Sequence, residues 1–278
     1  MIIRLTILLL VLFTPFSLAE ASTPVKAALL LNLDSGKILY ELNADRKVAP
    51  ASLTKIMTMF LTFDAIRSGK LNLKDKAVIS PTAAKIGGSV MQLKPGAAAP
   101  VVRLLAGAAV ASGNDAAMAL AEKVGGNAAK FVQMMNRKAA SLGMKRTQFK
   151  NPTGLPAAGQ KTTARDLARL CQAYLKNRPE AKRFHAMTNF MHQGRVIHNT
   201  NSLLVRVKGV NGLKTGWTVA SGYNLILTAK RGKINLLAIV LGAPNKIERD
   251  AMAIRLLEAG FQHPSSPAAA KKFIEAKK

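Results

Sequence analysis

The sequence predicts an α+β fold in which the two ends of the chain form one antiparallel sheet and the middle forms helices. Two strand-like segments near the N-terminus are joined by a turn at residues 34–36, and two longer ones near the C-terminus by a turn at residues 231–233. Between these hairpins the apolar residues recur mainly with helical spacing. We therefore expect a sheet flanked by helices, an inserted all-α lobe, and a cleft shared by the two lobes.

The N-terminal strands are predicted over residues 26–32 and 37–42. A helix is predicted over residues 53–66, because its apolar residues can form one stripe. The stripe consists of Ile56, Met57, Phe60, Leu61 and Ile66. Ser52 then stands at the start of this helix, and Lys55 lies one turn further along on the same side.

The middle of the chain is predicted to be helical, with loops at glycine- and proline-rich segments. The loops are expected at residues 87–96 and 151–156, and the helices at residues 101–111, 115–124, 128–142 and 163–176. The sheet resumes with strands at residues 222–230 and 234–242, followed by a closing helix at residues 246–259. The sequence contains no internal repeat.

The chain of 278 residues divides into three parts by composition. Residues 1–21 resemble a signal peptide, with Arg4, an apolar run over residues 5–13, and small residues at the predicted cleavage sites. The run is short for a membrane span, and an uncleaved anchor is the alternative. Residues 22–262 are predicted to form the catalytic domain, and residues 263–278 a basic, disordered tail. We expect an exported protein in the periplasm or on the cell envelope.

The cysteine and histidine content argues against disulfides and metals. Cys171 is the one cysteine, so an intramolecular disulfide cannot form, and its place on an amphipathic helix predicts a buried, apolar role. The four histidines lack the spacing of metal ligands. We expect neither a metal nor a cofactor.

The net charge of +27 favours anionic surroundings. Aromatic residues make up 5% of the chain and do not interleave with basic ones, so a stacking platform for nucleic acid lacks support. With an export signal, an anionic envelope surface is the expected partner, and a solubilising charged face is the alternative. The sequence leaves the oligomeric state open.

Three short motifs carry the chemistry: Ser52-Leu53-Thr54-Lys55, Ser112-Gly113-Asn114 and Lys214-Thr215-Gly216. They match S-x-x-K, S-x-N and K-T-G, which occur together in serine enzymes that attack D-alanyl peptides and β-lactams. Ser52 is the only serine in the chain with a lysine three residues later. Because the motifs also occur in the expected order, coincidence is a poor explanation.

These residues can together activate a serine nucleophile. Lys55 lies within reach of Ser52 and can act as its base when neutral, a state that burial and the second cation Lys214 favour. Ser112 is predicted to relay a proton to the leaving amine, and Asn114 to hold the substrate amide and brace Lys55. Each residue alone also fits an ordinary role, such as Ser52 as a helix cap, but the combination favours catalysis.

The strand edge that begins at Lys214 is the predicted place of the substrate. The backbone N–H of Ser52 and one just after Gly216 are predicted to form an oxyanion hole. Gly216 leaves the edge open, so that a peptide can lie alongside it.

On these motifs the chain resembles the low-molecular-mass penicillin-binding proteins, serine-type D-alanyl-D-alanine carboxypeptidases of the peptidase S11 type. Further matching segments are residues 88–91, 94–96, 112–116, 151–155, 163–167, 212–218, 222–225 and 241–242. The resemblance implies a β-lactamase/DD-peptidase-like fold. It also implies that Ser52 forms an acyl-enzyme, with release of the terminal D-alanine of peptidoglycan stem peptides, which water then hydrolyses. Penicillins and other β-lactams would acylate the same serine.

The resemblance also suggests residues that contact the substrate. Trp217 would supply the second oxyanion N–H, and Thr215, Thr218 and Arg249 would face the substrate carboxylate. Ser89 lies in a matching segment and is expected in the substrate site as well.

The chain departs from the family at several positions. Trp217 stands where tyrosine, phenylalanine or histidine is usual, and Thr200 where some relatives carry an arginine. Residues 97–99 are alanines in place of a polar, acidic stretch. Longer relatives continue into a β-rich second domain and an amphipathic membrane anchor, and the tail at residues 268–278 is too short for that domain.

Three other functions compete with this interpretation. A class A β-lactamase shares the motifs but needs an E-x-x-L-N loop, and neither Glu122 nor Glu180 begins one. A D,D-endopeptidase that cuts peptidoglycan crosslinks uses the same residues and stays open. A non-catalytic cell-wall-binding protein is disfavoured, because the motif residues are all intact.

Overall fold

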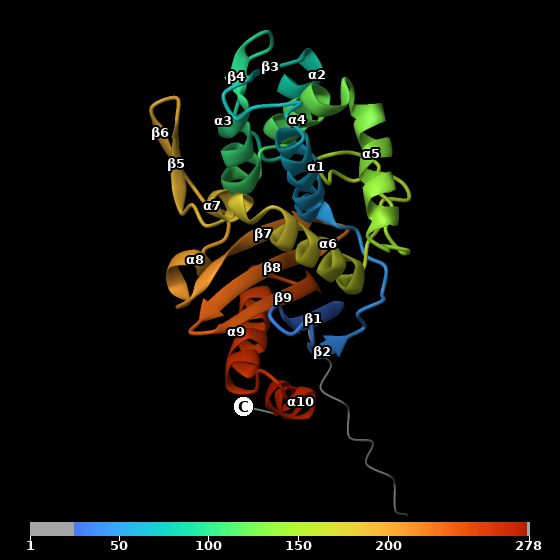
Figure 1. Ribbon diagram of the computed structural model, residues 1–278, viewed down its shortest axis with the longest axis vertical. Helices are drawn as coiled ribbons and strands as arrows, with labels where there is room; N and C mark the ends of the chain where they lie inside the picture. The colour runs from blue at the N-terminus through green and yellow to red at the C-terminus, as the bar shows by residue number, and fades with distance from the viewer. Residues whose placement is uncertain (1–24, 277–278) are drawn as a thin grey trace, which may run out of the picture.

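The computed structural model describes residues 25–276, so the predicted signal peptide at residues 1–21 lies outside the described part. It contains a five-stranded antiparallel sheet with the strand order β2-β1-β9-β8-β7 (Figure 1). The strands are β1 (Ala27–Asn32), β2 (Ile38–Leu42), β7 (Val210–Thr218), β8 (Gly222–Arg231) and β9 (Ile234–Ala243). The predicted α+β arrangement, with one sheet built from both ends of the chain, is confirmed.

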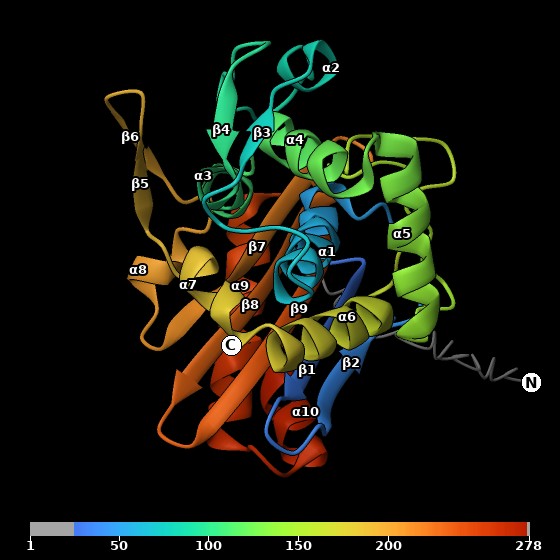
Figure 2. The same ribbon diagram turned by 45° about the horizontal axis from the view of Figure 1, so that its top comes forward.

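Strand β1 joins the two ends of the chain, because it pairs with β2 on one side and with β9 on the other. Its alternate residues enter two cores: Leu29 and Leu31 pack with the helices of the middle segment, and Leu30 with the C-terminal helices. A strand buried on both faces is apolar along its length, which explains the run Ala27–Leu31. Figure 2 shows α6 (Ala164–Asn177) in front of the sheet and α9 (Lys246–Gln262) behind it.

The middle of the chain forms the helical lobe around α1 (Lys55–Arg67). Every residue from Lys55 to Phe63 is buried, so α1 is enclosed on all sides and the single apolar stripe predicted for it is too narrow. It contacts η1 (Ala51–Thr54), the π-helical turn η2 (Gly107–Ala111), α4 (Asn114–Gly125), α5 (Ala128–Ser141) and α6. Helix α3 (Val101–Ala106) packs on α4 and η2. A small two-stranded sheet of β3 (Lys76–Val78) and β4 (Ala98–Pro100), together with α2 (Pro81–Ala84), lies at the top in Figure 1.

The segment between α6 and β7 contains elements that the sequence analysis did not predict. They are η3 (Pro179–Ala181), α7 (Lys182–His185), β5 (Asn189–His192), β6 (Arg195–His198) and α8 (Leu203–Arg206). Each has four residues or fewer, which is too short for its periodicity to stand out. The β5–β6 hairpin projects from the body of the molecule (Figure 1).

The prediction of a disordered tail over residues 263–278 is wrong for most of that segment, because Pro267–Glu275 forms α10. The Ser266 side chain accepts a hydrogen bond from the Ala269 N–H, and Pro267 occupies the first turn. Ala270 and Ile274 are buried in the same core as α9. Tertiary contact therefore orders the helix. Within residues 25–276, the helices lack the combination of length and apolar character that crossing a bilayer needs.

Candidate active site

Ser52 lies in η1, the 3-10 turn that leads into α1. Gly154 packs on this turn so closely that a Cβ there would lie 1.8 Å from the carbonyl oxygen of Ala51. A Cβ on Gly216 of β7 would lie 3.0 Å from the backbone nitrogen of Ser52. The serine is therefore held between β7 and the loop at residues 151–155, and the contact at Gly154 excludes any side chain.

Lys55, the first residue of α1, is fully buried beside Ser52. Its Nζ donates hydrogen bonds to Ser52 Oγ at 3.0 Å, to Asn114 Oδ1 at 2.6 Å and to the Thr153 carbonyl oxygen at 2.8 Å. A charged lysine has three donors, and these acceptors use all of them. When Nζ is neutral, its lone pair can instead accept the Ser52 proton while the other two contacts hold the amine in place.

The surroundings of Lys55 disfavour its charged form. Burial lowers the pKa of Lys55 well below its ordinary value, and the positive charge of Lys214 lowers it further, while Asp115 acts in the opposite direction. The pKa of Lys214 is itself lowered to about 7, first by burial and then by Arg249. These surroundings therefore favour the neutral form of Lys55, which is the state that a general base requires.

Asn114, the first residue of α4, connects Lys55 to the loop at residues 87–93. Its Oδ1 accepts a hydrogen bond from Lys55 Nζ, and its Nδ2 donates to the Gly87 carbonyl oxygen at 2.7 Å. A Cβ on Gly88 would lie 2.7 Å from Asn114 Nδ2, so the loop rests directly on this amide. One side chain thus holds Lys55 and positions the loop.

Asp115 ties the same loop to α4, a role that was not predicted from the sequence. Its carboxylate accepts hydrogen bonds from the Met91 N–H at 2.8 and 2.9 Å and from the Leu93 N–H at 3.1 Å. The Asn114 N–H donates to the Ser89 carbonyl oxygen at 2.7 Å. The place of Ser89 therefore depends on the first turn of α4. The available signal was an acidic residue directly after the S-x-N motif.

Ser112 follows the π-helical turn η2 in a left-handed conformation, with φ 59° and ψ 27°. This conformation is uncommon for a residue other than glycine and is concentrated at functional sites. The Gly113 N–H donates to the Gly107 carbonyl oxygen at 3.0 Å, which closes the widened turn. A Cβ on Gly107 would lie 1.8 Å from Met91 Sδ, so the turn also packs against the 87–93 loop.

Lys214 lies on β7, the edge strand of the sheet, and is 1% exposed. Its Nζ donates to the Thr215 carbonyl oxygen at 3.0 Å, and the hydroxyl groups of Thr215 and Thr200 share a hydrogen bond of 2.7 Å. In the described part of the chain the outer side of β7 carries no partner strand, so its edge can accept an extended peptide.

A buried histidine supports β7 from behind. His185 Nδ1 lies 3.0 Å from the Leu213 carbonyl oxygen, and its Nε2 lies 3.0 Å from the Tyr174 hydroxyl. Burial is the main cause that lowers the pKa of His185, to about 4, so the ring is neutral. Because a carbonyl oxygen can only accept, Nδ1 carries the proton and donates to the residue before Lys214.

Arg249, predicted to face the substrate carboxylate, lies buried on α9. Its Nε and Nη2 donate to Asp250 Oδ1 at 2.9 and 2.6 Å. It is close enough to lower the pKa of Lys214 but is not among the residues that line the cleft.

These elements surround a cleft of about 490 Å³ beside Ser52. Its lining consists of Ser52, Gly88, Ser89, Asn114, Gly154, Leu155, Trp217, Thr218 and Val219. The predicted site residues Lys55, Ser112, Lys214 and Thr215 are buried and are not part of this lining. Four of these lining residues were not predicted as site residues: Gly88, Gly154, Leu155 and Val219. In residues 25–276, His, Cys, Asp and Glu side chains form no group of three or more that could hold a metal. A serine with a buried lysine base can carry out acyl transfer.

Similar proteins identify the family. The chain matches the family Peptidase S11, described as D-alanyl-D-alanine carboxypeptidase, over residues 15–245. It is 39% identical over 254 residues to the D-alanyl-D-alanine carboxypeptidase DacF of Bacillus subtilis (strain 168), which covers 90% of this chain and 65% of DacF. It is 34% identical over 294 residues to the D-alanyl-D-alanine endopeptidase of Pseudomonas aeruginosa, which covers 95% of this chain and 92% of that protein.

Among solved structures, penicillin binding protein 5 from Haemophilus influenzae superimposes with a TM-score of 0.83 and 34% identity, covering 87% of this chain and 72% of that chain. This likeness confirms the predicted β-lactamase/DD-peptidase-like fold. The chain spans about two thirds of the length of DacF and nearly all of the endopeptidase. The sequence match over residues 15–245, together with this fold, shows that the chain belongs to the peptidase S11 family.

Proposed function

We propose that this protein is a serine D-alanyl-D-alanine carboxypeptidase that removes the terminal D-alanine from peptidoglycan stem peptides. The observation that carries the proposal is the 3.0 Å contact between Lys55 Nζ and Ser52 Oγ, in surroundings that lower the pKa of the lysine. A nucleophile beside a neutral base is what attack on a peptide carbonyl requires. The description of the family supports D-alanyl-D-alanine as the substrate.

In acylation, Ser52 Oγ attacks the carbonyl carbon of the penultimate D-alanine while its proton passes to Lys55 Nζ. The backbone N–H groups of Ser52 and Trp217 would stabilise the oxyanion. The carbon–nitrogen bond then breaks, and the leaving amine takes a proton along a relay of Ser112 and Lys214. The proton held by Lys55 replaces the one that the relay has given up, so Lys55 is neutral again before deacylation. The products of this step are D-alanine and an ester on Ser52.

In deacylation, a water molecule attacks the ester carbonyl and loses its proton to Lys55, and Ser52 leaves with a proton restored. With a β-lactam the same attack opens the ring and leaves an ester on Ser52, which persists until water hydrolyses it. Glu122 accepts a hydrogen bond from Ser80 Oγ at 2.9 Å, and Glu180 lies in η3, so neither carboxylate lines the cleft. This supports a long-lived penicillin adduct rather than a β-lactamase.

The proposal is tested by following the intact mass of the mature protein after mixing it with a fluorescent penicillin. We expect a lasting adduct on Ser52, its loss in Ser52→Ala, and its retention in Ser35→Ala, an exposed serine outside the site. Rapid loss of the adduct would instead indicate a β-lactamase. Labelling of Ser52→Ala, or none of the wild type, would overturn the mechanism.

A D,D-endopeptidase is the second candidate, because the endopeptidase of P. aeruginosa matches this chain over 92% of its own length. Both reactions use the same nucleophile and differ in the leaving group, which is free D-alanine in one and a crosslinked stem in the other. Digestion of purified crosslinked and uncrosslinked muropeptides, followed by mass spectrometry, separates them. Loss of a single D-alanine supports the carboxypeptidase, and conversion of dimers to monomers supports the endopeptidase.

We also propose that the protein acts in the cell envelope and that its charge retains it there. The net charge of +27 supports attraction to anionic wall polymers or lipid headgroups. Such attraction weakens as salt screens it, so envelope fractions washed with concentrated salt should release the protein. Retention that is independent of salt would contradict this role of the charge.

A further inference from the structure

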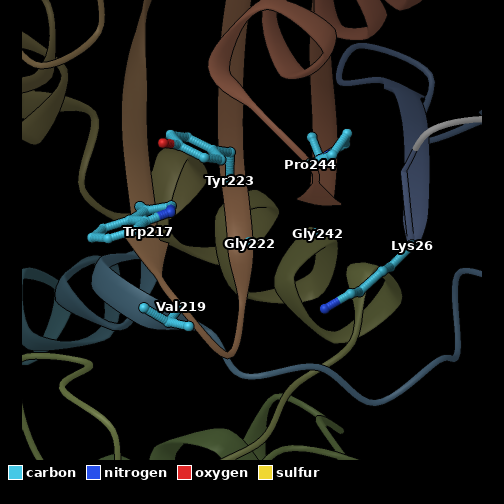
Figure 3. A pocket seen from close by; sticks show the side chains of 8 residues that line it. Lys26, Trp217, Val219, Gly222, Tyr223, Gly242 and Pro244 are labelled. Atoms are coloured by element: carbon cyan, nitrogen blue, oxygen red, sulfur yellow. The ribbon is translucent and has the colours of Figure 1, made fainter.

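A second hollow lies beside the active-site cleft, across the ends of β7, β8 and β9 (Figure 3). It has a volume of about 540 Å³ and is lined by Lys26, Trp217, Val219, Gly222, Tyr223, Gly242, Ala243 and Pro244. Trp217 and Val219 also line the active-site cleft, so the two hollows share a wall. The proposed reaction gives no role to Lys26 or Tyr223.

Lys26 is held in a defined place across the floor of this hollow. A Cβ on Gly242 would lie 2.4 Å from Lys26 Cδ, so the lysine stem rests directly on the glycine backbone. Gly242 also has a φ of +70°, which favours glycine. Lys26 Nζ donates to the Ala220 carbonyl oxygen at 3.3 Å, and Figure 3 shows the side chain extending towards the turn that carries Val219. The ammonium group is therefore positioned before any ligand arrives.

Two aromatic side chains form the opposite side of the hollow. Trp217 on β7 and Tyr223 on β8 are partners in the strand register, with ring centroids 5.7 Å apart. Trp217 is 54% exposed and Val219 is 90% exposed, which is high for large apolar side chains in a folded domain. Apolar surface facing one fixed ammonium group suits a ligand that has an aliphatic body and a carboxylate.

The direction of β7 indicates which part of a substrate reaches the hollow. This step rests on the proposed function and on the expectation that Thr215 faces the terminal carboxylate of the peptide. A peptide that pairs antiparallel with β7 then has its upstream residues beyond Trp217, towards Val219. Beyond Val219 the surface opens into the second hollow.

We propose that this hollow is a subsite for the upstream, acidic part of the stem peptide. Lys26 Nζ binds a carboxylate of that part of the peptide, and the aliphatic atoms of the peptide pack on Trp217 and Tyr223. The subsite therefore selects for a free carboxylate upstream of the scissile bond and does not alter the chemistry at Ser52.

The test uses the mature protein and three peptides that end in D-alanyl-D-alanine. The first carries an upstream γ-linked D-glutamate with a free carboxylate, the second its amide, and the third is a blocked tripeptide without that residue. We expect the wild type to prefer the acid over the amide by about tenfold in kcat/KM, as for one charge-assisted hydrogen bond. Lys26→Met, which keeps the stem, should abolish this preference.

Penicillin acylation and tripeptide hydrolysis by Lys26→Met should stay within about twofold of the wild type, because a subsite variant leaves the chemical step intact. Lys233→Met removes the same charge from the exposed β8–β9 turn and should keep the preference for the acid. If the wild type hydrolyses none of the peptides, the proposed function fails. If it hydrolyses the tripeptide but Lys26→Met keeps the preference, or the wild type shows none, the subsite is wrong.

Discussion

The carbonyl oxygen of Thr153 accepts a hydrogen bond from Lys55 Nζ at 2.8 Å. The loop that supplies this carbonyl also packs on the turn of Ser52, through Gly154. Asn151 Oδ1 fixes the loop by accepting hydrogen bonds from the Thr153 N–H at 3.2 Å and the Gly154 N–H at 2.7 Å. One loop thus positions both Ser52 and Lys55, although it contains neither.

The first prediction concerns Gly154→Ala. A Cβ there would lie 1.8 Å from the Ala51 carbonyl oxygen, at a φ of +86°, so the loop and the serine turn must separate. We expect the free energy of unfolding to fall by about 3 kcal/mol from overpacking and backbone strain. The penicillin acylation rate should fall by at least about a hundredfold, because small misplacements of reacting groups are costly. Denaturant unfolding and acylation kinetics measure the two effects.

Gly159→Ala is the matched control for this change. Gly159 has a similar φ of +77°, but the nearest atom to its Cβ would be Lys150 Cε at 3.4 Å. The Gly159→Ala variant should lose about 1 kcal/mol of unfolding free energy from backbone strain alone, and its penicillin acylation rate should stay unchanged. Equal effects of the two variants would show that the contact with Ala51 does not matter.

The second prediction concerns Asp115→Asn. The neutral amide accepts the Met91 and Leu93 N–H groups less strongly than the carboxylate, so stability should fall by about 1–3 kcal/mol. The change also removes the charge that raises the pKa of Lys55. The acidic limb of the acylation profile should therefore move to lower pH. A limb that stays in place would contradict the electrostatic role of Asp115.

The third prediction concerns Lys214 and the dependence of stability on pH. Its folded pKa is about 7, below the ordinary value of 10.5, so between these values the unfolded chain holds a proton that the folded chain has lost. The free energy of unfolding must therefore rise with pH between these two values. At pH values below the folded pKa, the cost of burying the charged Lys214 lowers the stability in full. Relative to that of Lys214→Met, the free energy of unfolding of the wild type should increase by roughly 3 kcal/mol from about pH 7 to about pH 10.

This difference is measured by chemical denaturation of both proteins at several pH values. Subtracting the variant removes the general effect of the declining net charge. Lys233→Met, at an exposed turn, should parallel the wild type across the whole range. A wild type that does not gain stability over Lys214→Met with rising pH would show that Lys214 is not desolvated.

The fourth prediction concerns the free thiol. Cys171 is buried on α6, and burial raises the pKa of its thiol, so both access and ionisation oppose alkylation. Iodoacetamide should leave the native protein unmodified for hours and modify it within minutes in denaturant, as mass spectrometry can show. Rapid modification of the native protein would mean that α6 opens from the sheet.

The sequence predicted the parts of the site whose signal is local. Ser52 and Lys55 are one helical turn apart, and the Arg231-Gly232-Lys233 turn between apolar runs specifies the β8–β9 hairpin. That the three motifs lie close together in the fold was predicted from their known association, because no local pattern indicates it. The predicted burial of Cys171 is confirmed.

The parts that could not be predicted depend on backbone atoms and tertiary contacts. The Thr153 carbonyl that holds Lys55 has no side-chain signature, because every residue has a carbonyl. The π-helical turn before Ser112 follows from closure by Gly113 rather than from composition. Helix α10 is short and alanine-rich. The residues that bury Ile274 lie elsewhere in the chain, so the sequence of the helix alone did not predict its burial.

The position of Lys55 as the first residue of α1 has an electrostatic consequence. The aligned peptide dipoles of a helix place a partial positive charge at its N-terminus. An ammonium group there is repelled by the helix, whereas negative charge developing at the carbonyl attacked by Ser52 is attracted. The same helix end therefore disfavours the ammonium form of Lys55 and would favour the transition state of the proposed attack by Ser52.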